Sequence, residues 1–559
     1  MRRSESHLVF LMTRFVSRGW AAGVVYAVVA VSAAAFGVAN GTFAAADTDP
    51  YGYVSQGELL AGGSMRLDVR FALDLPWTDA DASFVPPGFA PSEPRGFAVP
   101  TYPTGLPLVM AVLQRLTGRR GAVFYAVPLL GAMAVWMTAW LGARLHSALT
   151  GFWAAALLAT SPSFLYQITQ PVSDVPAAAW WTASLALAVH RGALPAFGAG
   201  TAAAMAVLTR PNLVPVAALI GAYFAWDVWH PSRHTRRAAL NRLALFAAGM
   251  APGILAVAAI NQYLFGSPLR SGYGSLNELY AWKSVLPNLS RYSRWLVETE
   301  SPLILLALAT PWFWPNARSG AQAEPIRDVR REALLLLGCA LLVVGSYLPW
   351  GVFEGWDFLR FLLPAFPPLI VLSVAVLTEG LRLLPWRRSV AVATTIGVLA
   401  CWAAWQAREA FNRGVTTIRQ GDQRYVDVSR YIAFALSRDS VFIAGLHSGS
   451  IRYHAGRPTL NFGRLDRASL DAAVAGLRAR GYRPYIVVEK GEEPAFRERF
   501  GGHSRLGALD WPPVSNTSRG VSVRIYDPAD RDRFLAGEPI ATVDMLFRHR
   551  SEGTFRERQ

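Results

Sequence analysis

Cysteine is nearly absent from this chain of 559 residues, which contains only Cys339 and Cys401. Both lie inside long apolar stretches, so a disulfide framework is not expected and any water-exposed part must fold by ordinary burial. Internal repeats and low-complexity tracts are also missing. The alanine-rich segments are typical of helix packing within a membrane.

Acidic residues are scarce as well. The chain has 38 Asp and Glu against 54 Lys and Arg, which gives a net charge of +16. A basic patch on a soluble domain would suggest a nucleic-acid partner. Here the basic residues are almost all arginines in short segments between apolar runs, where the positive-inside rule of membrane proteins accounts for them. No nucleic-acid partner is therefore expected.

Hydrophobic residues, in contrast, make up 52% of the chain and cluster in long runs. A hydrocarbon core of about 30 Å requires about 20 apolar residues per helix, and this length predicts about eleven spans. The first span indicates a retained signal anchor, because many further spans follow it. The expected spans are 21–42, 121–144, 147–161, 174–190, 193–209, 212–229, 240–262, 295–315, 332–352, 358–380 and 389–408.

The arginines predict the orientation of these spans. With a cytoplasmic N-terminus, the cytoplasmic connections would contain Arg144, Arg191, Arg233, Arg236, Arg237, Arg242, Arg318, Arg327, Arg330, Arg331, Arg382, Arg387 and Arg388. This asymmetry predicts a multi-pass protein of the cytoplasmic (inner) membrane with its N-terminus inside. The outer side would then carry the loop 43–120, the turn 161–174, the loop 261–294, the turn 353–360 and everything after about residue 409.

Two domains are expected: a transmembrane domain over 1–415 and a small soluble α/β domain over 416–559, outside the cytoplasm. The strand-like runs 441–444 and 485–488 and the amphipathic segment 470–480 support the second domain. His447 and His454 flank Ser448-Gly449-Ser450 in this region. No third ligand stands at a recognisable spacing, so a structural role is favoured over a metal site or a phosphate-binding loop.

Directly after the first span stands Asp47-Thr48-Asp49-Pro50-Tyr51-Gly52-Tyr53, which places two carboxylates at the boundary between lipid and water. A carboxylate there can accept a proton from a substrate held at the membrane surface. The alternative is that Asp-x-Asp-Pro only caps a helix that begins near Tyr51.

The same loop ends with 99–107 and then the apolar run 108–116, which is too short to span the membrane and predicts a helix lying in the interface.

Asp49 with Tyr53, followed by Tyr102-Pro103-x-Gly105-x-Pro107, resembles the GT-C glycosyltransferases of the Arn-T and rhizobial-Rgt type, which are similar to dolichyl-phosphate-mannose mannosyltransferases. The resemblance covers roughly 20–380 and extends through 209–212, 261–274 and 360–364. It implies a polytopic helical enzyme that uses a polyprenyl-phosphate sugar and keeps its chemistry in the first outer loop. Many relatives have Glu after the first acid, whereas this chain has Pro50, so the base is either Asp47 or Asp49.

The resemblance also implies an acid in the second outer turn, where Asp174 would orient the acceptor or share the work of the base. The alternative for Asp174 is a helix cap formed with Ser173. Arg360, Arg270 and Arg210 stand at outer ends of spans and are candidates for binding the lipid phosphate, with Arg360 favoured. For each of them the alternative is snorkelling to lipid headgroups. Tyr53 and Tyr102 are the expected substrate-binding residues.

The expected reaction is therefore the inverting transfer of a hexosyl or pentosyl group from a polyprenyl phosphate to a lipid, glycan or protein of the cell envelope. No cofactor is expected, and the sequence leaves a requirement for a divalent metal open. Two other classes of protein remain as alternatives: a flippase or transporter of lipid-linked sugar, and a membrane receptor that binds glycans without catalysis. Neither paired broken helices nor ionisable residues at mid-membrane depth, which a transporter would be expected to show, are evident in the sequence.

Overall fold

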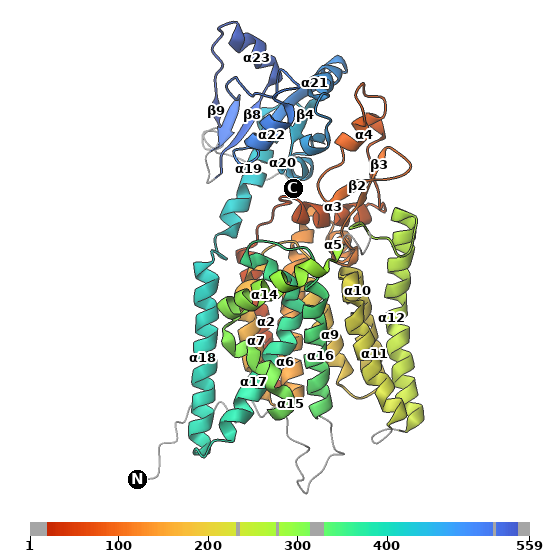
Figure 1. Cartoon of the computed structure of the whole chain (residues 1–559), viewed down its shortest axis with the longest axis vertical. Coiled ribbons are helices and arrows are strands. Elements are labelled where there is room, and N and C mark those ends of the chain that lie inside the picture. The colour runs from red at the N-terminus through yellow and green to blue at the C-terminus, as the bar shows by residue number, and fades with distance from the viewer. Residues whose placement is uncertain (1–18, 231–234, 275–278, 314–328, 518–520, 546–559) are drawn as a thin grey trace.

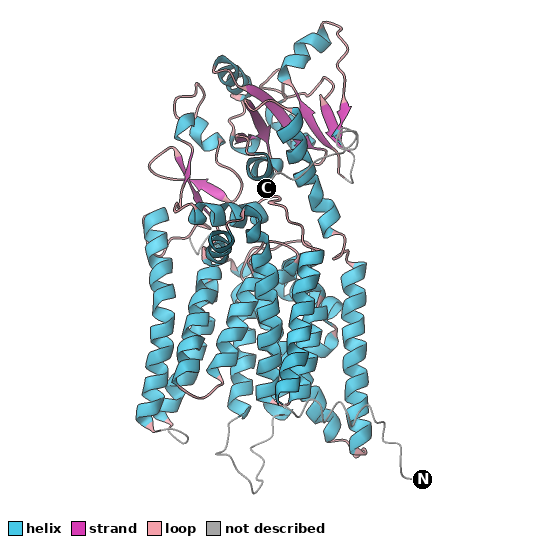
Figure 2. Ribbon diagram, turned by 180° about the vertical axis from the view of Figure 1, so that it is seen from behind, coloured by secondary structure: helices cyan, strands magenta, loops and turns pink. Residues whose placement is uncertain are grey.

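The computed structural model describes residues 19–230, 235–274, 279–313, 329–517 and 521–545. Its lower part is a bundle of roughly parallel and antiparallel helices, and a smaller region containing strands covers one end of that bundle (Figure 1). We call this the upper end. The residues 43–120 and the C-terminal domain both lie there, as the view from behind also shows (Figure 2). The predicted positions of Arg233, Arg318 and Arg327 fall outside the described residues.

The long helices follow most of the predicted spans closely. Within the described residues, six helices are long and apolar enough to cross a membrane, or seven if a bent pair of helices is counted as one span. The predicted total of eleven therefore stays a prediction. The helices of the bundle are α2 (Gly19–Ala39), α6 (Ala126–Leu145), α7 (Ala148–Thr160), α9 (Asp174–Ala188), α10 (Ala193–Thr209), α11 (Val214–Trp229), α12 (Arg236–Phe265), α16 (Val329–Tyr347), α17 (Phe366–Arg382) and α18 (Arg388–Asn412).

The predicted span 295–315 is wrong as a single helix. In the structure α14 (Val285–Glu300) stops at Ser301, and the 3-10 helix η5 (Pro302–Ala309) and the short α15 (Thr310–Phe313) follow it. Ser301 has a φ of 70°, and the next residue is proline. A positive φ followed by a residue without a backbone N–H cannot continue an α-helix.

A second interruption follows α7, where α8 (Pro162–Ile168) continues the chain after a bend of 63° at Ser161. The two interruptions meet at the buried carboxylate of Glu300. The Ser161 hydroxyl donates to Glu300 Oε1 at 2.8 Å, and Gln406 Nε2 on α18 donates to Oε2 at 2.6 Å. Both oxygens of this buried carboxylate are thus hydrogen-bonded inside the protein, as its apolar surroundings require.

The loop between the first two bundle helices is well structured. It contains α3 (Asp49–Ala61), a three-stranded antiparallel sheet and α5 (Gly105–Thr117), which includes the predicted interfacial segment 108–116. A Cβ atom at Gly105 would lie 2.4 Å from Thr209 Oγ1 at the end of α10, so only glycine allows α5 to seat there. The strands are β1 (Leu67–Asp68), β2 (Phe89–Pro91) and β3 (Phe97–Pro100), in the order β1-β3-β2.

The C-terminal region begins with α19 (Ile418–Ala435) and contains a six-stranded mixed sheet in the order β5-β4-β6-β8-β7-β9. The predicted runs 441–444 and 485–488 lie in β4 and β6, and the predicted helix 470–480 matches α21 (Leu470–Ala479). The remaining helices are α20 (His447–Ser450), the π-helical turn η7 (Ile451–Ala455), α22 (Glu493–Phe500) and α23 (Pro528–Leu535). The strands are β4 (Ser440–Ala444), β5 (Thr459–Asn461), β6 (Arg483–Glu489), β7 (Ser515–Thr517), β8 (Val523–Tyr526) and β9 (Val543–Asp544).

The first loop and the C-terminal region share one hydrophobic core. Val69, Trp77 and Phe84 of the loop pack with Ile443 and Leu477 of the sheet region, and all five are buried. These contacts join segments separated by more than 300 residues, so no local sequence pattern predicts them. The C-terminal region is therefore built around part of the first loop.

The C-terminal region also contacts the segment that leads into α3. A Cβ atom at Gly449 in α20 would lie 2.4 Å from the Tyr51 ring, so glycine permits α20 to lie directly on that ring. His454 Nε2 accepts a hydrogen bond of 3.0 Å from the backbone N–H of Ala45. His447 is fully buried, and its Nε2 lies 3.4 Å from Glu489. Both histidines thus make structural contacts.

The contact at Gly449 gives a stability prediction. We expect Gly449→Ala to lower the free energy of unfolding by about 1–3 kcal/mol, because the new methyl group overpacks against the Tyr51 ring. The thermal midpoint of the purified protein in detergent measures this change. Gly502→Ala is the matched control, because a Cβ atom at Gly502 meets nothing within 4 Å. Equal midpoints for the two variants would contradict the close contact between α20 and α3.

Candidate active site

The Asp49 carboxylate, at the first residue of α3, has two side-chain partners. Tyr102 Oη donates to Oδ1 at 2.5 Å, and Arg360 Nη2 donates to Oδ2 at 2.8 Å. Tyr102 can approach because residue 52 is glycine: a Cβ atom at Gly52 would lie 2.4 Å from the Tyr102 ring. Three segments far apart in the sequence thus meet at one carboxylate, which keeps about a third of its side-chain surface exposed.

The alternative that Asp49 only caps α3 is wrong. Thr48 is the N-cap residue and makes no side-chain capping hydrogen bond, while the Asp49 carboxylate is engaged by Tyr102 and Arg360. Asp47 is exposed and has a φ of 46°, and its Oδ1 accepts a hydrogen bond of 3.1 Å from the neighbouring Thr48 hydroxyl. Of the two candidates for the base, the geometry therefore favours Asp49.

Arg360 lies in the 3-10 helix η6 (Trp356–Ala365), which leads into α17. Its side chain is only 18% exposed, and its guanidinium lies 5.4 Å from the ring centres of both Phe358 and Phe361. This packing does not fit snorkelling to a headgroup. Within the described residues, Arg360 Nε is buried without a hydrogen-bond partner. The guanidinium therefore pairs with a carboxylate through one nitrogen and keeps another donor unused.

Asp174 and Arg210 form a second, more deeply buried ion pair. Arg210 Nη2 donates to Asp174 Oδ1 at 2.5 Å, and the two side chains are 10% and 2% exposed, respectively. Arg210 Nη1 donates to Tyr347 Oη at 2.8 Å, and Nε lies 3.5 Å from Ser173 Oγ. All three nitrogens of Arg210 therefore face protein partners, which leaves Arg210 less suited than Arg360 to receive a phosphate. Ser173 is the N-cap residue of α9 but makes no capping hydrogen bond.

Tyr53 joins the two ion pairs. Its hydroxyl donates to Ser173 Oγ at 2.8 Å, and its ring centre lies 4.7 Å from that of Tyr102. Burial and the neighbouring Asp49 charge raise the pKa of both the Tyr53 and the Tyr102 hydroxyls above the ordinary tyrosine value. Both hydroxyls thus stay protonated and act as donors. Tyr102 therefore orients the Asp49 carboxylate, and Tyr53 contacts the Ser173 side of the second ion pair. Substrate binding by these two tyrosines stays a prediction.

The third candidate arginine, Arg270, is exposed and forms no ion pair with any described residue. Its loop nevertheless reaches the site through Tyr273, whose ring centre lies 6.0 Å from that of Tyr102. A Cβ atom at Gly272 would lie 2.4 Å from the Thr101 carbonyl oxygen, so the loop sits directly on the chain before Tyr102. Arg270 stands two residues from this contact. Its role in phosphate binding stays a prediction.

Sequence reasoning missed Tyr273 and Tyr347. Tyr273 lay inside the motif 261–274 and could have been singled out there. Tyr347 closes an apolar helix, where a tyrosine ordinarily marks only the membrane interface. Its hydroxyl became visible as a partner of Arg210 only in three dimensions.

A metal site does not emerge from the geometry. Among the described residues, no group of three or more His, Cys, Asp or Glu side chains is placed to hold a metal ion. What the arrangement offers chemically is a partly exposed carboxylate beside a guanidinium with a spare donor. A carboxylate of this kind can accept a proton, and the guanidinium can bind an anion such as a phosphate.

Comparison with solved structures places this geometry in a known fold. No protein-family model and no curated protein sequence matches the chain. The crystal structure of ArnT from Cupriavidus metallidurans bound to undecaprenyl phosphate matches 91% of this chain and 98% of its own, with 13% identity and a TM-score of 0.51. The apo state of that ArnT has a TM-score of 0.52 at the same identity and coverage.

The Archaeoglobus fulgidus oligosaccharyltransferase in complex with Zn and sulfate matches 89% of this chain and 73% of its own, with 11% identity and a TM-score of 0.46. The match to ArnT spans the bundle and the upper end alike, because it covers nearly the whole of both chains. The resemblance inferred from the motifs is confirmed at the level of the fold: the chain has the GT-C fold of ArnT.

Proposed function

We propose that this chain is a membrane glycosyltransferase that moves one sugar from a polyprenyl-phosphate donor to an acceptor hydroxyl or amine of the cell envelope. The observation that carries the proposal is the pair of Asp49 and Arg360, joined at 2.8 Å, with Arg360 Nε buried and unpartnered within the described residues. A base and a cation that binds phosphate are the two groups that this reaction requires.

The donor phosphate competes with Asp49 for the Arg360 guanidinium. A phosphate that takes the spare Nε and an Nη nitrogen gains two charge-assisted hydrogen bonds. Its arrival also releases the Asp49 carboxylate from its cation, and this leaves Asp49 available as a base. Donor binding and activation of the base are thus coupled through one side chain.

In the proposed step the acceptor oxygen attacks the anomeric carbon while its proton passes to Asp49. The bond between that carbon and the phosphate oxygen breaks, and the leaving phosphate keeps the electron pair. Arg360 stabilises the negative charge that grows on this oxygen. A single displacement inverts the configuration of the anomeric carbon. The transferred group is a hexosyl or pentosyl residue.

Asp174 and Arg210 serve this reaction by holding the residues around Asp49 in place. Both are nearly inaccessible and neutralise each other, and breaking such a buried pair leaves an uncompensated charge that costs about 3–5 kcal/mol. Through Ser173 and Tyr53 the pair fixes the tyrosines beside Asp49. We assign Asp174 this positioning role, and orientation of the acceptor follows from it.

The solved ArnT structure with undecaprenyl phosphate supports a polyprenyl-phosphate donor, since the two folds correspond over nearly their full lengths. The charge distribution supports a location in the cytoplasmic membrane with the upper end outward. Arg144 lies in the last turn of α6, Arg191 follows α9, and Arg242, Arg331 and Arg388 lie in the first two turns of α12, α16 and α18. Figure 1 shows these helix ends on the side of the bundle opposite the strand-containing region. Arginine-rich connections face the cytoplasm.

The proposal predicts distinct results for the two adjacent acids. We expect Asp49→Asn to lower turnover at least about 100-fold, because the amide keeps the size of the side chain but accepts no proton. Asp47→Asn, the matched control two residues away, should retain most of the activity. The measurement is sugar transfer by purified protein supplied with a panel of polyprenyl-phosphate monosaccharides, with and without a chelator.

Thermal midpoints of both variants are recorded alongside, so that a folding defect is separated from a chemical one. Near-normal turnover in Asp49→Asn together with loss in Asp47→Asn would move the base by two residues. Normal turnover in both variants would remove this motif from the mechanism.

A further inference from the structure

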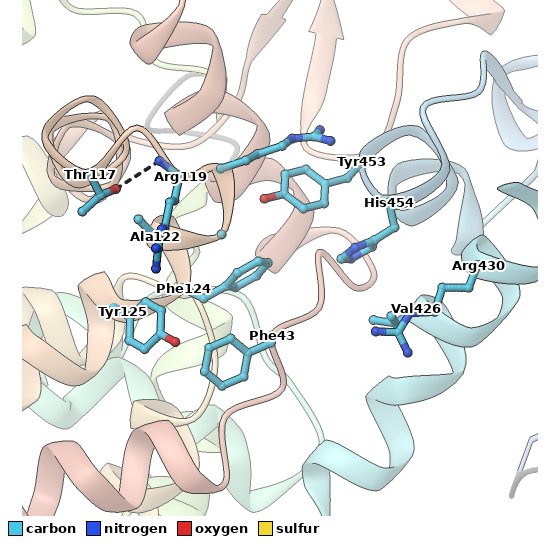
Figure 3. A pocket seen from close by; sticks show the side chains of 12 residues that line it. Phe43, Thr117, Arg119, Ala122, Phe124, Tyr125, Val426, Arg430, Tyr453 and His454 are labelled. Atoms are coloured by element: carbon cyan, nitrogen blue, oxygen red, sulfur yellow. Dashed lines mark hydrogen bonds between the residues drawn. The ribbon is translucent and has the colours of Figure 1, made fainter. Parts of the chain in front are cut away.

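A cavity lies at the upper end of the bundle, away from the ion pair of Asp49 and Arg360. It has a volume of about 730 Å³ and is lined by the segment before α3, the 3-10 helix η2 (Arg120–Tyr125) that leads into α6, and two elements of the C-terminal region, α19 and η7 (Figure 3). This volume is in the range of sites that bind small molecules. None of its lining residues belongs to the network around Asp49.

Arginines give this cavity its charge. Arg119, Arg120 and Arg430 line it, and the lining contains no Asp or Glu. Arg120 is compensated by an ion pair with Glu58. Arg119 and Arg430 form no ion pair with any residue that the structure describes. Two guanidinium groups therefore face the cavity from opposite sides without a protein anion, as Figure 3 shows.

A buried polar group independently points to a ligand. Tyr453 is only 6% exposed, and its hydroxyl is buried without a hydrogen-bond partner among the described residues. Figure 3 shows this hydroxyl directed into the cavity, toward the side formed by Arg119 and Ala122. Its ring is held by Arg120, whose guanidinium carbon lies 4.2 Å from the ring centre. A buried hydroxyl without a partner is costly, and a bound acceptor oxygen would satisfy it.

Exposed apolar side chains stand next to the lining residues in the sequence. Leu116, beside Thr117 at the end of α5, is 78% exposed, and Tyr125 at the end of η2 and Leu129 in the first turn of α6 are 44% and 55% exposed. The helix that begins at Arg120 is one of those long and apolar enough to cross a membrane. Residues 119–125, six of which line the cavity beside the apolar part of that helix, therefore stand where the helix would leave the hydrocarbon core, at the depth of the headgroups.

We propose that this cavity binds the anionic headgroup of a membrane phospholipid. Arg119 and Arg430 bind the phosphate, and the Tyr453 hydroxyl donates to one of its oxygens. The acyl chains lie along Leu116, Tyr125 and Leu129 outside the cavity. This site is separate from the one for the donor phosphate, since Glu58, which anchors Arg120, lies nine residues beyond Asp49, about 13 Å along α3. The proposal does not depend on the proposed reaction.

Native mass spectrometry of the purified protein in detergent tests the proposal. We expect phosphatidylglycerol to bind more tightly than phosphatidylcholine, and the double variant Arg119→Ala/Arg430→Ala to lose about tenfold or more in affinity for phosphatidylglycerol. The matched control is Arg438→Ala/Arg467→Ala. It removes the same charge from exposed positions of the C-terminal region that do not line the cavity.

Tyr453→Phe is a milder second variant that keeps the ring and removes only the hydroxyl. It should also weaken the binding of phosphatidylglycerol, with a thermal midpoint of the lipid-free protein that is equal or higher, because the lost hydroxyl has no partner among the described residues. Equal losses in the two double variants would overturn the proposal, as would equal binding of the two lipids by the unaltered protein. Displacement of phosphatidylglycerol by millimolar inorganic phosphate alone would also overturn it, because the site would then be one for a free anion.

Discussion

The proposed chemistry at the upper end of the molecule depends on the ion pair between Asp49 and Arg360. The two residues are separated by 311 positions, and their contact at 2.8 Å fixes the start of α3 against the turn that leads into α17. A half-buried ion pair contributes little net stability, because the cost of desolvating both charges offsets their attraction. The proposed reaction needs both charges, and this proposal accounts for the pair better than a role in folding does.

The C-terminal region packs against the first loop, which carries Asp49. One of its hydrophobic cores includes residues of the first loop, among them Trp77 and Phe84. Gly449 lies on Tyr51, and His454 accepts from the backbone of Ala45, so both contacts brace the short segment that carries Asp49. The C-terminal region thus holds the first loop, which carries the Asp49 carboxylate, in place. The arginine-lined cavity lies between this region and the helices of the bundle.

Much of this could be predicted from the sequence, because hydrophobic length and a short motif each carry a local signal. The apolar runs predicted most of the bundle helices to within a few residues, and the motifs brought Asp49, Tyr102 and Arg360 forward before any contact was known. The break at Ser301 was missed, although Pro302 marks a helix boundary in the sequence; only the positive φ of Ser301 required the structure. Two further features could not be predicted: the hydrogen bond between Arg210 and Tyr347, and the hydrophobic core shared across the predicted domain boundary. Both join residues far apart in the sequence, and such contacts produce no periodic pattern of residues.

The proposed function depends on the transfer of the Arg360 guanidinium from Asp49 to a phosphate, and the turnover of Arg360 variants at saturating donor measures this step. Arg360→Lys keeps the charge but loses the planar fork, so turnover should fall clearly, and Arg360→Ala should lower it further while the protein remains folded. A loss in the turnover number as well as in donor affinity is expected, because the interaction strengthens as phosphate leaves. Full turnover of Arg360→Ala at saturating donor, with only protein abundance reduced, would contradict the account.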